Sequence, residues 1–191
     1  MKTAILILAA GLSNRFSRAG QGNKLTALLH GKPVLQHTLE NARATGFDVC
    51  VVTRSDETLV QAMVRPDYVL KYRSDGMGDS IAAGIAAVPD YDGWLIVPGD
   101  MPFLTTSSYL AVGEALKTSP VARAEVNGIA GHPVGFQRRF YSALTGLTGD
   151  SGARSLLTTA SLTLVRLADR GCLQDIDTRE ELRLYNRSGS V

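Results

Sequence analysis

The residues best suited to chemistry at the start of the chain form the segment Leu8-Ala9-Ala10-Gly11-Leu12-Ser13-Asn14-Arg15. It follows an apolar run, and a strand that opens into small residues leaves main-chain N–H groups available to phosphate oxygens. Gly11 can adopt backbone angles closed to other residues, and Lys24 adds a mobile positive charge. The segment predicts either a phosphate cradle or a turn in which small residues only ease the exit from a strand.

A second segment with chemical potential is Val97-Pro98-Gly99-Asp100, which ends another apolar run. Asp100 would lie at the carboxyl end of a strand, the edge that binds ligands in open α/β sheets. A carboxylate that faces a phosphate cradle needs a cation between them, and Mg²⁺ commonly bridges carboxylates and nucleotide phosphates. We therefore expect Asp100 to be a metal ligand; the alternative is a turn or helix-capping residue.

Other classes of site have little support in the sequence. The three-glycine dinucleotide motif and the Gly-Lys-Ser/Thr phosphate loop are both absent. The two cysteines lie far apart, and the three histidines form no close pair, so zinc and redox sites are not expected. Cys50 lies in an apolar run and is expected to pack as a small hydrophobe. Any metal should be hard and oxygen-bound.

The elements that position these residues alternate along the chain. Strands are expected at residues 4–8, 49–53, 68–71, 94–97 and 162–167, with amphipathic segments between them. One helix should begin at Pro33 and end near Gly46, and a second apolar stripe is formed by Ile81, Ile85 and Val88. This alternation predicts an α/β fold with a mostly parallel sheet and helices on both faces.

Two later segments depart from that alternation. Residues 121–126 and 131–136 contain glycine and proline within apolar alternation, which predicts a hairpin or mixed-sheet extension that lines one side of a cleft. Asp177 precedes Thr178 and an acidic first turn, so a final helix should begin there. We favour Asp177 as the cap of that helix over a role as a second metal ligand.

Length and charge limit the remaining possibilities. The 191 residues suit a single domain, which we place at 1–187, with 188–191 as a disordered tail. The net charge of +2 is spread without a basic stripe, so no nucleic-acid partner is expected. The first apolar run is too short to span a bilayer, so we expect no membrane association and a cytoplasmic protein.

Seven motifs occur in order along nearly the whole chain: Leu8-Ala9-Ala10-Gly11 with Ser13, Arg15 and Lys24; Gly31-Lys32-Pro33-Val34-Leu35; Gly76-Met77-Gly78-Asp79-Ser80-Ile81; Pro98-Gly99-Asp100-Met101-Pro102; Gly131-His132-Pro133-Val134; Gly149-Asp150-Ser151-Gly152-Ala153-Arg154; and Asp175-Ile176-Asp177-Thr178. Together they resemble the MobA-like nucleotidyltransferases, and among these the cytidylyltransferases that act on the molybdenum cofactor. The resemblance implies a Rossmann-like fold. It also implies transfer of CMP from CTP to the terminal phosphate of molybdopterin, with Mg²⁺ and release of pyrophosphate.

The resemblance also implies roles for individual residues. Arg15 and Lys24 would contact the nucleotide phosphates, and Asp100 would hold the metal. The nucleotide would be surrounded by Leu8, Ala9, Ala10, Gly11, Leu12, Ser13, Gly78, Ser80, Pro98 and Gly99. The acceptor would contact His132, Pro133 and Arg154, and a molybdoenzyme would receive the product.

Several positions leave alternatives open. Arg15 and Lys24 stand farther apart than is usual in the family, so Arg18 competes with Lys24 for the phosphate contact. Asp79 would cap a helix or contact a ribose hydroxyl, and Arg154 could instead pair with Asp150. Ala10, where guanine-using members tend to have glycine, favours cytosine. The rival functions are a guanylyltransferase, a sugar-phosphate nucleotidyltransferase, and a non-catalytic carrier of the molybdenum cofactor.

Overall fold

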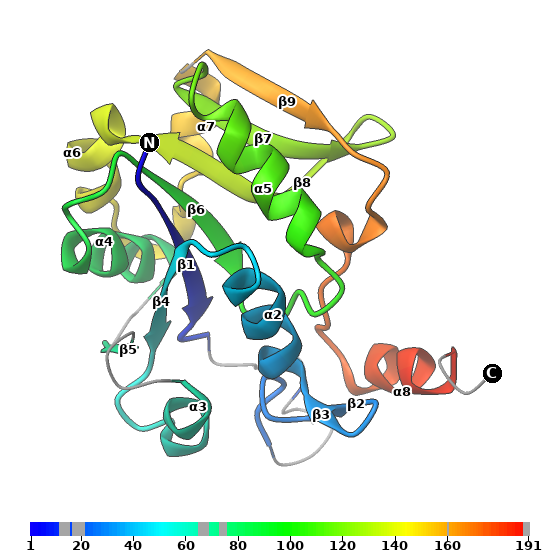
Figure 1. Ribbon diagram of the computed structural model, residues 1–191. Helices are drawn as coiled ribbons and strands as arrows, with labels where there is room; N and C mark the ends of the chain where they lie inside the picture. The colour runs from blue at the N-terminus through cyan, green and yellow to red at the C-terminus, as the bar shows by residue number, and fades with distance from the viewer. Residues whose placement is uncertain (12–15, 17–21, 65–68, 73–75, 160, 189–191) are drawn as a thin grey trace.

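The fold is built on one large mixed sheet (Figure 1). The computed structural model describes residues 1–11, 16, 22–64, 69–72, 76–159 and 161–188. The seven-stranded sheet has the order β5-β4-β1-β6-β8-β7-β9. Its strands are β1 (Thr3–Ala9), β4 (Asp48–Thr53), β5 (Val69–Lys71), β6 (Gly93–Pro98), β7 (Val121–Val126), β8 (Ile129–Gln137) and β9 (Leu162–Arg166). A separate two-stranded sheet pairs β2 (Leu28–Leu29) with β3 (Lys32–Pro33).

Strand directions confirm the mostly parallel sheet. β1 runs parallel to β4 and β6, β5 parallel to β4, and β9 parallel to β7. Within the described strands of the seven-stranded sheet, only β8 runs antiparallel to its neighbours, β6 and β7. The expected hairpin is therefore the β7–β8 pair, which turns at Asn127 (φ 51°) and Gly128 (φ 82°). Two positive φ values in succession are typical of a two-residue type I′ turn.

Helices cover both faces of the sheet, as the sequence predicts. They are α2 (Val34–Arg43), α3 (Thr58–Met63), α4 (Met77–Ala87), α5 (Thr106–Ala115), α6 (Tyr141–Thr145), α7 (Arg154–Thr159) and α8 (Arg179–Ser188), with short 3₁₀ turns η2 (Arg138–Phe140), η3 (Gly149–Ser151) and η4 (Arg170–Leu173). Leu35 and Leu39 of α2 share one core with Val112 of α5. Ile81 and Ile85 of α4 belong to the core on the opposite face.

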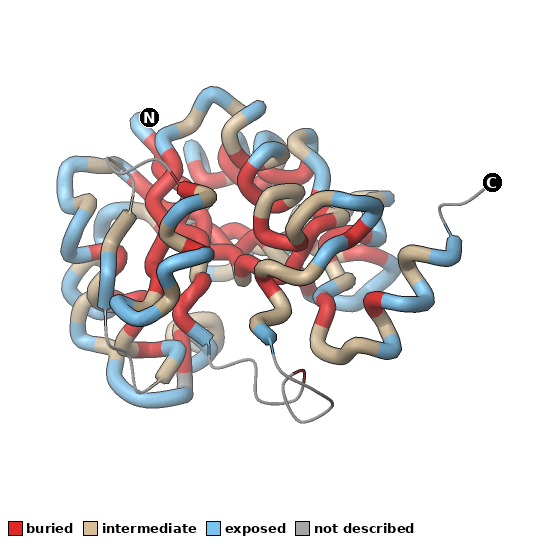
Figure 2. Tube along the Cα trace, turned by 90° about the horizontal axis from the view of Figure 1, so that it is seen from below, coloured by how far each residue is buried: buried red, intermediate tan, exposed pale blue. Residues whose placement is uncertain are grey.

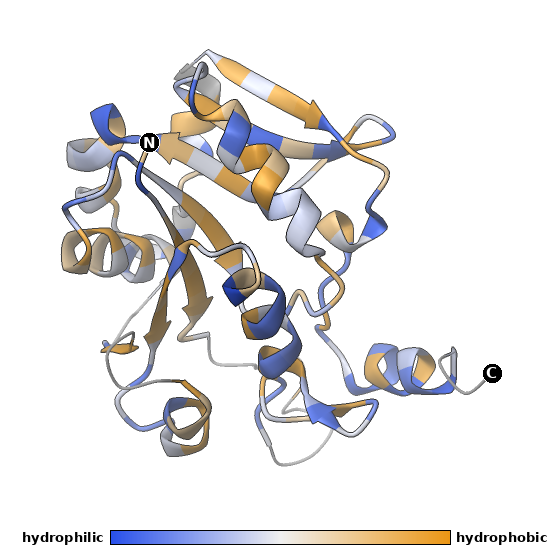
Figure 3. Ribbon diagram, viewed as in Figure 1, coloured by the Kyte–Doolittle hydropathy of each residue, from blue (hydrophilic) through white to orange (hydrophobic). Residues whose placement is uncertain are grey.

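The alternation of side chains along β1 joins these two cores. Ile5 and Ile7 face the α2–α5 side, whereas Ala4 and Leu6 face the α4 side, and all four are at most 1% exposed. Figure 2 shows this buried centre running through the strands, with exposed residues on the covering helices and loops. Figure 3 shows the same contrast between apolar β6 and the largely hydrophilic α2. The expected strand at 4–8 is thus buried on both faces.

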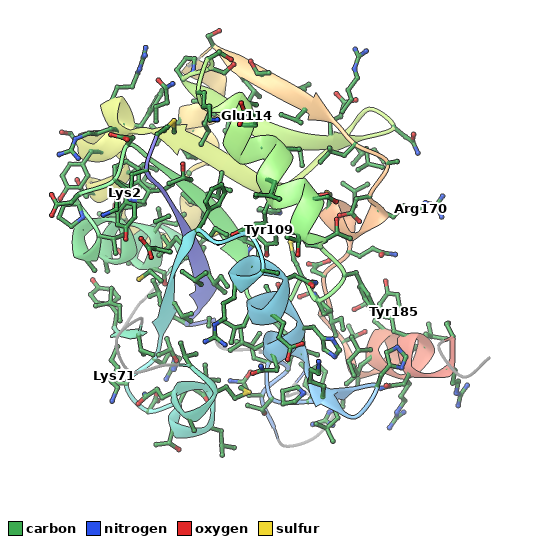
Figure 4. The ribbon with its side chains drawn as sticks, in the orientation of Figure 1. Lys2, Lys71, Tyr109, Glu114, Arg170 and Tyr185 are labelled. Carbon is green, nitrogen blue, oxygen red and sulfur yellow. The ribbon has the colours of Figure 1, made fainter. Side chains whose placement is uncertain are left out.

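The C-terminal helix α8 packs beside the sheet and not on it (Figure 1). Leu182 and Ile176 form a small third core with Leu29, Val34 and Phe16. Tyr185 of α8, labelled in Figure 4, contacts the ring of Phe103 with 4.6 Å between ring centroids. Ser188, the first residue of the expected tail, is the last residue of α8, and its hydroxyl donates to the carbonyl of Leu184. Residues 189–191 lie outside the described residues, so the tail stays a prediction.

Within the described part of the chain, no helix is long and apolar enough to cross a bilayer.

Candidate functional site

The carboxyl ends of β1 and β6 lie side by side and form the base of the site. Leu8 pairs with Pro98, and the Gly99 N–H donates to the carbonyl of Leu8 at 2.9 Å. A Cβ on Gly99 would lie 3.1 Å from that carbonyl oxygen and 3.2 Å from the side chain of Leu35, so glycine allows this close turn. The hydroxyl of Thr38 donates to the carbonyl of Gly99 at 3.0 Å. The turn delivers Asp100 to the strand edge, as the sequence predicts.

Asp100 is one of three aspartates that converge at this edge. Asp100, Asp175 and Asp177 each present a carboxylate oxygen within 4.8 Å of the others. The Ile176 N–H donates to the main-chain carbonyl of Asp100 at 3.0 Å, which ties the later segment to the earlier one. Because Ile176 is buried, the aspartates on either side of it share the opposite side of an extended segment.

The electrostatics of this cluster favour a cation. Asp100 is only 8% exposed, and its Oδ1 atom is buried without a hydrogen-bond partner in the described structure. Partial burial, with the nearby carboxylates of Asp177 and Asp100, raises the pKa of Asp175. The two neighbouring carboxylates therefore make ionisation of Asp175 costlier, and added positive charge would offset that cost. Three carboxylates with one unpaired buried oxygen fit a hard divalent ion.

Lys24 already supplies part of that positive charge. Its ammonium contacts the carboxylate of Asp100 and lies 2.8 Å from Oδ1 of Asp177. Partial burial alone would lower the pKa of Lys24, but the two carboxylates outweigh it and raise that pKa. The structure thus brings two predicted residues, Lys24 and Asp100, together. It shows Lys24 bound to carboxylates, a contact that the sequence did not suggest.

The cap of α8 corrects the preferred role of Asp177. The Thr178 hydroxyl accepts from the Glu181 N–H at 3.2 Å, while the Glu181 carboxylate accepts from the N–H groups of Thr178 and Asp177, each at 2.9 Å. This reciprocal pair is a capping box with Thr178 at the cap position. Asp177 precedes the cap, and its carboxylate faces Lys24 and Asp100. The sequence signal for Asp175 was the Asp-Ile-Asp alternation, to which no role was given.

A cavity of about 490 Å³ opens beside the same strand ends and extends across the sheet. Its lining residues come from β1, β6, β7 and β8, from the first half of α4, from the segment before α7, and from α7 itself: Leu8, Met77, Ile81, Ile96, Pro98, Arg123, His132, Val134, Phe136, Asp150, Gly152, Ala153, Arg154 and Leu157. Arg154 makes no ion pair with any residue that the structure describes, so the expected alternative of an Arg154–Asp150 pair is not observed. His132 and Arg154 were predicted here. Pro133 is buried and is not among the lining residues, and Arg123 was not predicted.

The start of α4 is built for packing against the 148–150 segment. A Cβ on Gly78 would lie 2.8 Å from the carbonyl oxygens of Thr148 and Gly149, so a larger residue would collide with main chain. The Asp79 carboxylate accepts from the Gly149 N–H at 3.3 Å, and the Ser80 hydroxyl donates to the carbonyl of Gly76 at 3.3 Å. Asp79 therefore contacts this segment and does not cap α4, whose cap residue is Gly76. A ribose contact of Asp79 and nucleotide contacts of Gly78 and Ser80 stay predictions.

The opening loop is described only in part. Ala9 and Ala10 are buried where β1 ends, and Gly11 is exposed with open space around its α-carbon. Leu12, Ser13, Arg15 and Arg18 lie outside the described residues. The choice between Lys24 and Arg18 as the phosphate contact therefore remains a prediction. Figure 4 places Lys71 near this end of the sheet and Lys2 at the opposite end.

Comparison with known proteins places the chain in a family. The model of the MobA-like NTP transferase domain matches residues 5–166. The chain belongs to this family. The resemblance inferred from the motifs is thereby confirmed, and the general activity of the chain is nucleotidyl transfer.

Individual proteins resemble the chain in sequence, and one solved structure resembles it in fold. Purine catabolism protein PucB of Bacillus subtilis is 28% identical over 202 residues, which cover 97% of this chain and 96% of PucB. Bifunctional protein GlmU of Thiobacillus denitrificans is 30% identical over 144 residues, and the match covers 72% of this chain but only 30% of GlmU. Rv0371c of Mycobacterium tuberculosis H37Rv, solved in complex with manganese, has a TM-score of 0.82 and 23% identity, with 98% of this chain and 100% of that chain covered.

Proposed function

We propose that this protein transfers CMP from CTP to the terminal phosphate of a molybdopterin-type acceptor and releases pyrophosphate. The observation that carries the proposal is the arrangement of the three-aspartate cluster and the adjoining cavity at one edge of the sheet. The cluster offers a place for the metal–phosphate part of a nucleotide, and the cavity offers a place for the acceptor. The product would pass to a molybdoenzyme, and the reaction would take place in the cytoplasm.

A divalent cation, which we propose to be Mg²⁺, would be held by Asp100, Asp175 and Asp177. The unpartnered Oδ1 of Asp100 and the all-oxygen donor set support this choice. The manganese complex of the similarly folded Rv0371c supports a divalent ion at this kind of fold. When bound, such an ion supplies positive charge that stabilises the phosphates of the nucleotide during transfer.

The chain's own residues would hold the nucleotide for in-line attack. An oxygen of the acceptor phosphate bonds to the α-phosphorus of CTP, and the bond from that phosphorus to the bridging oxygen breaks, so pyrophosphate leaves with the electron pair. A phosphate oxygen is already deprotonated, so positioning and cationic stabilisation contribute more than a protein base. Main-chain N–H groups of the 9–13 loop, with Arg15, would orient the phosphates. Lys24 would also contact the phosphates, after its ammonium group moves away from the carboxylates of Asp100 and Asp177.

The lining of the cavity favours a pterin-type acceptor over a sugar phosphate. Its charged or strongly polar side chains are Arg123, His132, Asp150 and Arg154, and most of the remaining surface is apolar. A sugar would leave several hydroxyl groups facing apolar side chains, which costs free energy for each unpaired group. The likeness to GlmU, a bifunctional protein by name, keeps the sugar-phosphate alternative as the second candidate.

The test is pyrophosphate release from each of the four NTPs, with molybdopterin, with glucose 1-phosphate, or with neither. We expect release that requires molybdopterin and is fastest with CTP, and a product whose mass equals that of molybdopterin plus CMP minus water. Turnover only with glucose 1-phosphate would show that the acceptor is a sugar phosphate. Fastest turnover with GTP would show that the enzyme transfers GMP and not CMP. Binding of molybdopterin without pyrophosphate release from any NTP would favour the carrier function.

A further inference from the structure

The first residue of the C-terminal helix α8 contacts the loop that follows β1 at two points. The guanidinium of Arg179 lies over the ring of Phe16, 4.6 Å from the ring centroid. A Cβ on Gly22 would lie 3.4 Å from Nη2 of the same guanidinium. Phe16 follows Arg15 directly, and Gly22 lies two residues before Lys24. One side chain therefore contacts the loop near each of these two positive residues along the sequence.

The position of Arg179 in α8 is not explained by the helix itself. The partial positive charge of a helix N-terminus favours acidic side chains in the first turn, such as Glu180 and Glu181, and disfavours a cation. A planar guanidinium over an aromatic ring gains a cation–π attraction, which is stronger when the pair is shielded from water. Phe16 is 1% exposed and Arg179 is partly buried. The contact with the loop therefore accounts for an arginine at this position.

The segment that carries Arg179 also holds the loop through Lys24. Oδ1 of Asp177 lies 2.8 Å from the ammonium of Lys24. The capping box of Thr178 and Glu181 fixes the backbone between Asp177 and Arg179. Both residues therefore contact the loop from one rigid base.

These two contacts respond differently to a nucleotide. In the proposed function, the ammonium of Lys24 leaves its carboxylates and contacts phosphate. The ring of Phe16 belongs instead to the third core, with Ile176 and Leu182, and needs no phosphate partner. The contact of Arg179 with Phe16 can therefore persist while Lys24 changes partners.

We propose that Arg179 is a positioning residue, which acts through Phe16 and Gly22 to hold the loop in the arrangement that binds the triphosphate of the nucleotide. The proposal rests on nucleotidyl transfer, the general activity of the family, and on the proposed function only for the exchange of partners by Lys24. A loop that is already held at two points loses less conformational entropy when phosphates bind. Arg179 thereby strengthens nucleotide binding without a contact to the nucleotide.

Nucleotide binding without an acceptor tests this role. Calorimetry measures the affinity of the wild type for non-hydrolysable analogues of the four NTPs with Mg²⁺, and the variants are compared on the analogue that binds most tightly. Tightest binding of a purine analogue would contradict the choice of CTP and leave this test intact. Arg179→Met should weaken binding about tenfold, the effect of losing one shielded cation–π contact.

The matched control is Arg183→Met, which removes an exposed arginine one turn further along α8. This variant should bind the analogue within about twofold of the wild type. Equal nucleotide affinity of Arg179→Met and Arg183→Met would overturn the proposal.

Metal binding and thermal unfolding separate positioning from the docking of α8. Arg179→Met should keep its Mn²⁺ affinity within about threefold and its melting temperature within a few degrees, because Ile176 and Leu182 still anchor the segment. Losses of Mn²⁺ affinity or melting temperature that match the loss of nucleotide affinity would overturn the proposal. If the wild type binds no Mn²⁺, the proposed metal site is wrong and the melting temperature alone measures docking.

A double-mutant cycle shows whether Arg179 acts through Phe16. Phe16→Leu keeps an apolar side chain in the third core and removes the ring. If the guanidinium acts through the ring, the double variant Phe16→Leu/Arg179→Met should bind nucleotide at most about threefold more weakly than the weaker single variant. Losses that multiply would show that Arg179 binds the nucleotide independently of Phe16, and would overturn the positioning role.

Discussion

At the scale of single residues, the ammonium group of Lys24 contacts two of the three carboxylates that we propose as metal ligands. Its ammonium shares Asp100 and Asp177 with the proposed metal, so the two positive charges compete for the same carboxylates. Removing the ammonium should strengthen Mn²⁺ binding to the nucleotide-free protein by on the order of tenfold, because about one nearby positive charge is lost.

The variant that tests this competition is Lys24→Met, with Mn²⁺ affinity measured by electron paramagnetic resonance without nucleotide. The same variant should lose about a hundredfold in kcat/KM, because the proposed role of Lys24 is to neutralise phosphate in the transition state. Lys32→Met, which removes an exposed lysine paired with Glu40, should change neither quantity. Weaker Mn²⁺ binding in Lys24→Met would show that the lysine supports the metal site and does not compete with it.

Asp100 allows a sharper test because it is the buried member of the cluster. Asp100→Asn keeps the size of the side chain and removes its charge, so transfer should fall by at least about a thousandfold while the melting temperature stays within a few degrees. Turnover and thermal unfolding are measured on the same preparation. Asp56→Asn, on an exposed surface pair with Arg54, serves as the control. Near-normal turnover of Asp100→Asn at saturating Mg²⁺ would make Asp100 a structural residue.

At the scale of elements, Asp169 joins α5 to η4 and so supports the segment that carries two of the three aspartates. Its carboxylate accepts from the Thr105 N–H at 3.0 Å, the Ser108 hydroxyl at 2.7 Å and the Gly171 N–H at 2.9 Å. Partial burial alone would raise the pKa of Asp169, but these hydrogen bonds outweigh it and lower that pKa.

A lowered folded-state pKa means that Asp169 stabilises the fold above its unfolded pKa, near 4, and that this stability is lost as the pH falls through the folded value. Asp169→Ala should therefore unfold with about 2–3 kcal/mol less free energy at pH 7, with the gap closing toward pH 3. Urea unfolding at several pH values measures it. A gap that is constant with pH would mean that packing, and not the charge, accounts for the loss.

Which elements the sequence could predict depends on whether the signal is local. Apolar runs predicted β1, β4 and β6 within one or two residues, because burial on both faces of a sheet leaves a local pattern. The edge strand β9, which is half-exposed, was predicted equally well from its run of β-branched and apolar residues, and Pro33 marked the start of α2. The pairing of Lys24 with Asp177 joins residues 153 positions apart, so no local pattern records it. Arg123 was missed because a charged residue in a short strand resembles an ordinary solvent-facing position, and only the strand order brings it to the cavity.

At the scale of the whole molecule, the preference for CTP or GTP tests the proposal that the protein is a cytidylyltransferase. Ala10 is 6% exposed where β1 ends, and its methyl group would take up space beside the base. We expect kcat/KM to favour CTP over GTP by roughly tenfold to a few hundredfold, the effect of one methyl-sized steric difference. Ala10→Gly should reduce this ratio. Equal kcat/KM values for CTP and GTP in the wild type would contradict the proposal that the protein transfers CMP. Its membership of the MobA-like family would still stand.

The three aspartates of the site are synthesised at different times, because two of them follow the last strand of the sheet. The last strand of the sheet, β9, ends at Arg166, whereas Asp175 and Asp177 follow it in a segment tied back to Asp100 through the Ile176 N–H. A ribosome-bound chain that has just exposed β9 already contains every strand, Lys24 and Asp100, but lacks two of the three carboxylates. Since domains commonly begin to fold during synthesis, the sheet of the nascent chain can form while the carboxylate of Asp100 is paired only with the ammonium of Lys24. The proposed metal site would then gain its full set of three carboxylates only when the final segment docks against Asp100.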